Sequence, residues 1–217
     1  MSGPRQSPAA LRQLLAGRFP PPRPRNPGLV PTGIGSFDRE TGGGIPSGAL
    51  TEVVSPAPGC GGQLVIAGLL GATRSARLRA ALVDGSDGFD PQSHEPEFLR
   101  HLVWVRCRDA SRAAQAADIL VRDANLALVI VDLSGFRPAP CRALPASFWF
   151  RLQRAAEQAG SAALILAPCA VVGSARLRLA LGEGLRLDDL DRERDTLADR
   201  LVFELRRGPA LDERKIA

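Results

Sequence analysis

The stretch that decides the fold is "LTEVVSPAPGCGGQL", Leu50 to Leu64, in which a glycine-rich turn joins an apolar run to a helix-like run. Residues 50–54 predict a short buried strand, and Gln63–Ala72 predicts a buried helix. A glycine-rich turn at such a junction is typical of a phosphate-binding loop. This turn lacks the lysine and the following hydroxyl that such loops use on a nucleotide, so it has the position of the loop without its charged group.

Outward from this turn, apolar runs alternate with helix-like segments. The further strand candidates are Ala80–Asp84, Leu102–Arg106, Leu126–Asp132 and Ala162–Ala167, and the longer helix candidates are Ala110–Asn125 and Pro145–Ala159. Continuous apolar runs are typical of parallel strands that are covered on both faces. The alternation therefore predicts an α/β fold with a mostly parallel sheet and helices on both faces.

The two ends of the chain differ from this core. A helix is predicted near the N-terminus, with one apolar face made by Leu11, Leu14, Leu15 and Phe19. The proline-rich stretch after it predicts an extended spacer, so the helix forms an arm that packs on this domain or on a partner. We expect three parts and no large C-terminal domain: an arm and linker (1–28), a core (29–187), and a charged C-terminal strand and tail (188–217).

The composition sets limits on compartment and chemistry. The 217 residues carry a net charge of +5 and are 45% hydrophobic, which suits one packed domain. No run of apolar residues is long enough for a membrane span, and no secretory signal is visible, so we expect a cytoplasmic protein without membrane contact. The four cysteines form no C-x-x-C pair, so buried free thiols are expected and no metal site.

Three segments resemble the core of the RecA-like superfamily. They are "VPTGIGSFDRETGGGIPSGALTEVVSP" (Val30–Pro56), "ALVDGSDGFDP" (Ala81–Pro91) and "LALVIVDLSG" (Leu126–Gly135). Their order and spacing are similar to RecA from about residue 29 to residue 170. The short length and the basic strand "RLVFELRRG" near the end are most similar to the ImuA family. The resemblance implies a RecA-like core and a nucleoid-associated role in SOS mutagenesis, the bacterial response to DNA damage.

The resemblance also shows what the phosphate loop has lost. Gly59, Gly61 and Gly62 belong to a degenerate loop, because Gly61 stands at the lysine position and Gly62 at the hydroxyl position. One preorganised donor of this kind is typically worth about 3–4 kcal/mol of transition-state stabilisation. We therefore expect a pseudo-ATPase with no catalytic residue, no cofactor, and ATP binding that is weak or absent.

Two further positions agree with this expectation. Ser86 stands where RecA-like ATPases carry a glutamate that positions water, and Pro168 stands where they carry a polar γ-phosphate sensor. Asp132 alone is retained, as a remnant of the Walker B carboxylate that ends its strand.

Four arginines are candidates for DNA contacts, because they lie in the stretches that correspond to the two DNA loops of RecA. They are Arg137, Arg142, Arg176 and Arg178. Such side chains neutralise phosphates without reading sequence. The alternative is an arginine-rich solvated surface. The aromatic run Phe148–Phe150 could stack on bases, but core packing is the favoured interpretation.

The sequence favours a non-catalytic adaptor in translesion DNA synthesis that modulates RecA. The implied partners are RecA, an ImuB-like homologue of Y-family polymerases, an error-prone C-family polymerase reached through it, and DNA. The N-terminal arm is the candidate contact for RecA, and the C-terminal tail is the candidate contact for the ImuB-like partner. The alternatives are a DNA-binding protein of the RecA family and an active DNA-dependent ATPase.

Overall fold

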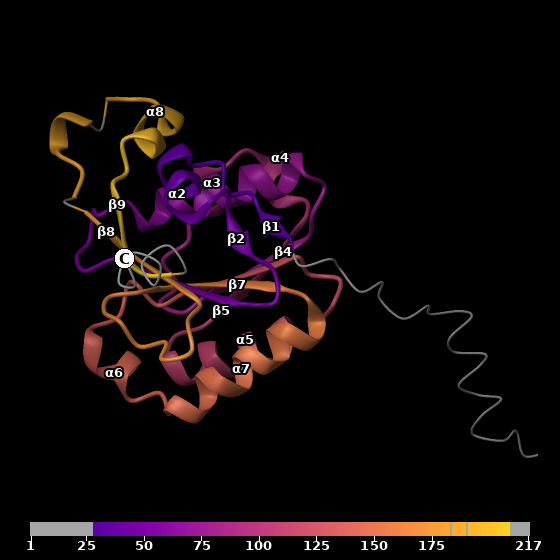
Figure 1. Ribbon diagram of the computed structural model, residues 1–217. Coiled ribbons are helices and arrows are strands. Elements are labelled where there is room, and N and C mark those ends of the chain that lie inside the picture. Colours follow the sequence, from indigo (N-terminus) through magenta and orange to yellow (C-terminus); the bar gives the residue numbers. More distant parts are fainter. Residues whose placement is uncertain (1–27, 183, 190, 209–217) are drawn as a thin grey trace, which may run out of the picture.

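The computed structural model describes residues 28–182, 184–189 and 191–208, and within them a single mixed sheet forms the centre of the molecule (Figure 1). The sheet has seven strands in the order β5-β4-β6-β7-β3-β8-β9. Neighbouring strands are parallel except β8 and β9. The strands are β3 (Leu50–Val54), β4 (Ala80–Asp84), β5 (Leu102–Arg106), β6 (Leu128–Asp132), β7 (Ala162–Ala167), β8 (Leu177–Leu181) and β9 (Phe203–Arg207).

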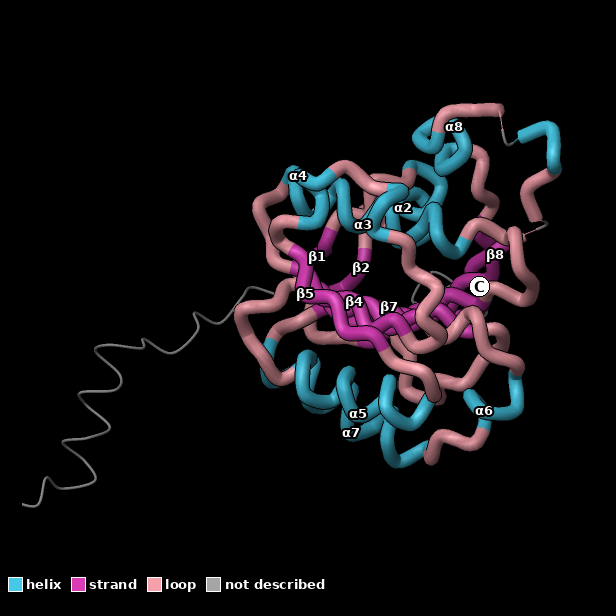
Figure 2. The backbone as a smooth tube through the Cα atoms, turned by 180° about the vertical axis from the view of Figure 1, so that it is seen from behind, coloured by secondary structure: helices cyan, strands magenta, loops and turns pink. Residues whose placement is uncertain are grey.

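Helices cover both faces of this sheet, as the back view in Figure 2 also shows. One face carries α2 (Gly35–Thr41), α3 (Gly62–Ser75) and α4 (Pro96–Leu99), and the other carries α5 (Ala110–Val121), α6 (Pro138–Arg142) and α7 (Ala146–Ala159). The remaining elements are the small hairpin of β1 (Leu29–Val30) and β2 (Ile45–Pro46), helix α8 (Arg194–Asp199), and two 3₁₀ turns at Pro91–Ser93 and Leu187–Asp189.

The central strands are buried on both sides, which explains their continuous apolar sequence. In β6, Leu128 and Ile130 belong to the core under α3, whereas Val129 and Val131 belong to the core under α5 and α7. Side chains alternate between the two faces of a strand, so one run of apolar residues supplies both cores. The predicted α/β class, with its mostly parallel sheet and two helical layers, is confirmed.

Several predicted boundaries agree with the structure and others do not. β3, β4, β5 and β7 have the predicted bounds, while β6 starts at Leu128 rather than Leu126. α5 ends at Val121, because Asp123 accepts the amide of Asn125 in a local turn instead of continuing the helix. The sequence did not predict α2, α6 or β8. The predicted N-terminal helix lies outside the described residues.

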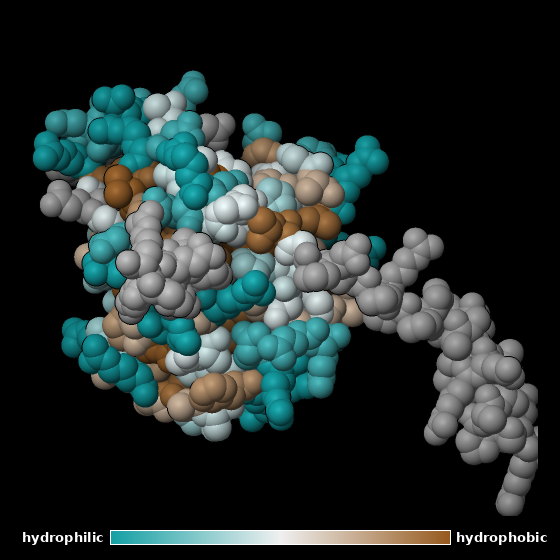
Figure 3. Space-filling view, viewed as in Figure 1, coloured by the Kyte–Doolittle hydropathy of each residue, from teal (hydrophilic) through white to brown (hydrophobic). Residues whose placement is uncertain are grey.

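The segment from residue 188 onward, expected as a separate charged end, supplies part of the same packing unit. β9 pairs antiparallel with β8 and closes one edge of the sheet. The Phe203 ring meets the Phe37 ring edge-on, with 5.1 Å between centroids, so α2 packs on β9. Hydrophilic side chains dominate the surface around α8 (Figure 3). A boundary at residue 187 therefore does not separate two packing units among the described residues.

No helix among the described residues is long and apolar enough to span a membrane.

Candidate functional site

The glycine-rich turn lies between the carboxyl end of β3 and the first residue of α3, as the sequence predicts for a phosphate-loop position. Gly61 precedes α3 with a φ of 95°, a left-handed conformation that only glycine adopts without strain. No side chain caps this helix end. The turn borders a cavity of about 370 Å³. Its lining residues are Ser55, Ala57, Pro58, Gly59, Gly61, Gly62, Gln63, Leu64, Ser134, Gly135 and Leu185.

This cavity has no described charged side chain in its lining. The three candidate glycines, Gly59, Gly61 and Gly62, do line it together. Backbone amides at the start of α3 remain without partners inside the helix, because the first turn of a helix has none. A phosphate here would therefore meet amides and a helix dipole but no cation from the described lining.

The C-terminal segment closes over the turn. The Leu185 amide donates to the Gly59 carbonyl at 2.9 Å. A Cβ atom added at Gly61 would stand 2.3 Å from Cδ2 of Leu201, which is itself buried. Leu201 therefore occupies the space into which a side chain at position 61 would project.

Asp132 ends β6 and faces the first turn of α3. Its Oδ2 accepts from Nε2 of Gln63 at 3.0 Å, and its Oδ1 accepts from the amide and the hydroxyl of Ser134 at 2.9 and 2.6 Å. Burial raises the pKa of the Asp132 carboxyl above its usual range, and the nearby Asp84 adds to the rise, while the hydrogen bonds from Ser134 and Gln63 oppose it. Asp132 is thus a buried, hydrogen-bonded link between β6 and α3.

The other strand-end carboxylate has a structural task. Asp84, which ends β4, accepts from the amides of Gly88 and Phe89 at 2.8 and 3.0 Å, and it holds the loop after its strand. The Ser86 hydroxyl lies against Gly135, where an added Cβ would stand 2.2 Å from its Oγ. The described residues contain no group of three or more His, Cys, Asp or Glu side chains that could hold a metal ion.

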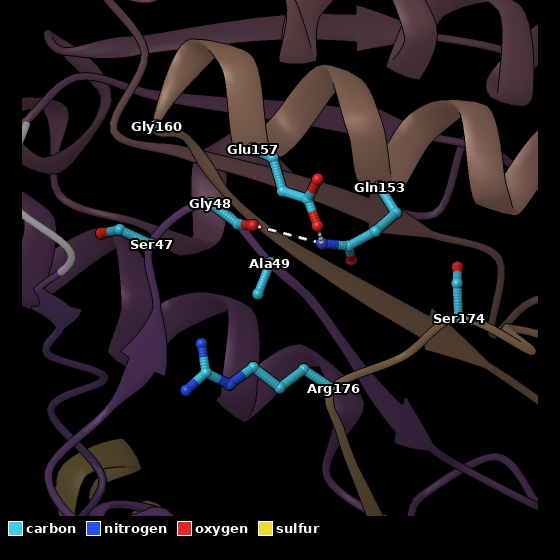
Figure 4. A pocket seen from close by; sticks show the side chains of 8 residues that line it. All are labelled: Ser47, Gly48, Ala49, Gln153, Glu157, Gly160, Ser174 and Arg176. Atoms are coloured by element: carbon cyan, nitrogen blue, oxygen red, sulfur yellow. Dashed lines mark hydrogen bonds between the residues drawn. The ribbon is translucent and has the colours of Figure 1, made fainter. Parts of the chain in front are cut away.

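The four candidate DNA-binding arginines do not form one surface. Arg137 and Arg142 flank α6, are exposed, and lie at the carboxyl ends of the strands. Arg176 lies at the opposite end, where its amide donates to the carbonyl of Leu50 at the start of β3. It lines a cavity of about 580 Å³ with Gln153 and Glu157 of α7 and with residues 47–49, which precede β3 (Figure 4).

Arg178 is not on a loop, which corrects the sequence-based expectation. It lies in β8, and its guanidinium pairs with Glu52 and donates to the carbonyl of Val172 at 2.8 Å. Glu52 is fully buried in β3 and also accepts from the amides of Val171 and Val172 at 2.6 and 2.9 Å. The second expected DNA loop is therefore held in place by a buried carboxylate.

Sequence reasoning missed Glu52, although one signal was available. A lone carboxylate inside the apolar strand "LTEVV" must find a cation or several amides, because an unpaired buried charge is very costly. The aromatic run was interpreted correctly for two of its members: Phe148 and Trp149 are buried with their rings 4.8 Å apart, whereas Phe150 is exposed.

No protein-family model matches the chain, and no curated protein matches it.

The ion pair of Glu52 predicts a large difference between two nearby arginines. Arg178→Ala leaves a buried carboxylate without its cation, which typically costs about 3–5 kcal/mol and somewhat less here because Arg178 is partly exposed. Arg176→Ala removes an exposed side chain and should change the free energy of unfolding by no more than about 0.5 kcal/mol. Urea denaturation measures both. Equal losses in the two variants would contradict this account of Glu52.

The environment of Asp132 predicts a dependence of stability on pH. Its folded-state pKa lies above the unfolded value of about 3.9. Its contribution to stability is therefore greatest below that value and is lost as the pH rises through the folded pKa. The advantage of the wild type over Asp132→Asn in free energy of unfolding should shrink from about pH 4 to pH 7. Denaturation across this range tests it, with the exposed Asp188→Asn as control. An advantage that grows with pH would refute the prediction.

Proposed function

We propose that the chain is a non-catalytic accessory protein with a RecA-like core, which acts as an adaptor in SOS-induced mutagenesis and translesion DNA synthesis. The arrangement of β3, the glycine-rich turn, α3 and Asp132 supports the RecA-like core. β7 lies between β3 and β6, and Gln63 in the first turn of α3 reaches the carboxylate that ends β6. These are the places where a RecA-like ATPase carries its phosphate loop and its metal-binding carboxylate.

One observation carries the non-catalytic part of the proposal: glycine stands at the lysine position, and a Cβ at Gly61 would meet the end of the Leu201 side chain, which would have to move. The surrounding positions agree with it, because Ser86 stands at the glutamate position and Pro168 at the sensor position. Each lost electrostatic group removes orders of magnitude in rate, so three together remove turnover.

The adaptor role and its partners rest on the resemblance to ImuA. The proposed partners are RecA, an ImuB-like homologue of Y-family polymerases, and through it an error-prone C-family polymerase, in the cytoplasm at the nucleoid. A DNA-binding protein of the RecA family is the second candidate. The exposed Arg137 and Arg142, at the two ends of α6, favour that alternative.

We predict no ATP turnover above the protein-free background, with or without single-stranded DNA. The restored loop, Gly61→Lys with Gly62→Thr, should also show none, because Ser86 and Pro168 remain and the end of the Leu201 side chain would have to move. The φ of 95° at Gly61 adds strain of about 1–3 kcal/mol for any side chain, so this variant should melt at a lower temperature.

A radiolabelled-ATP assay and a thermal melt measure these outcomes. Gly71→Ala is the matched control within the same helix, since its Cβ would meet open space and should raise stability by up to about 1 kcal/mol. Turnover by the wild type would overturn the pseudo-ATPase assignment, and turnover by the restored loop alone would show that Ser86 and Pro168 do not prevent hydrolysis.

The arm gives a test of the adaptor role. In the full-length chain, replacing Leu11, Leu14, Leu15 and Phe19 by alanine should abolish capture of RecA in a pull-down, because the apolar face of the predicted helix is removed. Arg12→Ala with Gln13→Ala, on the same helix, should keep capture. Equal capture by both variants would show that the arm is not the contact.

A further inference from the structure

A second site lies at the amino ends of the strands, opposite the glycine-rich turn, and this site is charged. There α3 ends and β4 and β5 begin, and a cavity of about 580 Å³ opens to the surface. Its lining residues are Arg74, Ser75, Arg77, Leu78, Arg79 and His101. Three of these carry a guanidinium group, and only Leu78 is apolar.

The backbone holds two of these arginines firmly. At the end of α3 the amide of Leu78 donates to the carbonyl of Thr73 at 2.8 Å, and that of Arg77 donates to the carbonyl of Arg74 at 3.0 Å. This is the Schellman end of a helix, in which the residue at position 77 takes a left-handed conformation. The carbonyl of Arg79 accepts the amide of Ala127 at 2.9 Å. The backbones of Arg77 and Arg79 are therefore both held in place at the rim of the cavity.

Arg77 stands where a helix of this kind normally has glycine. Its φ is 54°, a conformation that costs an ordinary residue about 1 kcal/mol or more. Glycine would fit this backbone without strain, yet the chain has a long cationic side chain there. Strained non-glycine positions are concentrated at functional sites, so the outlier points to a use for the Arg77 side chain.

The charge of this rim is not balanced by its neighbours. Glu97 pairs with both Arg74 and Arg100, at 3.0 and 3.1 Å. No described carboxylate pairs with Arg77 or Arg79, which are both exposed. The cavity and its ion-pair partners therefore carry four guanidinium groups against one carboxylate.

From these observations we infer that the Arg74–Arg77–Arg79 cavity binds the phosphate groups of a single-stranded nucleic acid backbone. Guanidinium forks match phosphate oxygens in pairs. Five of the six lining residues are polar or charged, so a partner bound here meets mainly guanidinium groups. A partner bound here gains its affinity from charge, which is the mode of sequence-independent binding to nucleic acids. This site is distinct from the arginines of the two stretches that resemble RecA loops, and it does not depend on the adaptor role.

The test uses fluorescence anisotropy with the full-length chain and a labelled oligo(dT) of about 16 nucleotides, the upper end of common site sizes. Arg77→Gly with Arg79→Ala should weaken binding about fivefold or more at roughly 50 mM salt. The slope of log K against log salt should become shallower by about 1.4, for two lost phosphate contacts. The glycine at position 77 relieves strain, so thermal stability should not fall enough to explain the loss.

Two controls separate this site from net charge and from the loops. Arg39→Ala with Arg154→Ala removes the same charge at two exposed residues of α2 and α7, and it should leave the salt slope unchanged. Glu97→Gln releases Arg74 and Arg100 and should tighten binding, an effect that unfolding cannot mimic.

Several results would overturn the inference. These are no binding by the wild type at roughly 50 mM salt, equal losses in the two double-arginine variants, or a loss confined to Arg137→Ala with Arg142→Ala. Equal competition by a poly-glutamate of matched charge would show that the site does not select phosphate.

Discussion

The ion pair between the buried Glu52 and Arg178 is the interaction on which strands β8 and β9 depend. Glu52 lies in the central strand β3 and binds Arg178 of β8 together with two amides of the loop that precedes β8. β8 in turn pairs with β9, and the residues just before β9 include Leu201, which covers Gly61. One ion pair inside the sheet therefore sets the position of the segment that closes the glycine-rich turn. A buried pair adds little net stability but strongly penalises any arrangement that separates its partners.

This chain of contacts explains why the turn can lack a cation and still keep its shape. In a working phosphate loop, a lysine and a bound nucleotide hold the backbone from one side. Here the Leu185 amide and the Leu201 side chain occupy that side, and Gln63 ties α3 to Asp132. Contacts within the chain therefore support the left-handed glycine turn.

The sequence predicted those features that depend on local pattern. Strands such as 80–84 and 162–167 were found with correct bounds because their apolar runs are short and end at polar residues or turns. β8 was missed because "LRLAL" alternates polar and apolar residues within a stretch interpreted as a loop. The pairing of Arg178 with Glu52 could not be found from sequence. The two residues are more than a hundred positions apart, and their contact depends on the order of the strands in the sheet. The three glycines came together as expected, since they are neighbours in one turn, whereas the four arginines did not.

The carboxyl and amino ends of the strands are therefore chemically different, and the linear sequence does not show this difference. The carboxyl ends of the strands, where α/β proteins usually bind ligands, border a cavity whose described lining carries no charged side chain. The amino edge presents Arg74, Arg77 and Arg79 around an open cavity, with an arginine retained where a helix end favours glycine. A strained arginine at the amino ends of the strands has a cost in stability that glycine at the same position would avoid. Because the strained arginine is retained at the amino ends of the strands, we expect contact with an anionic partner there.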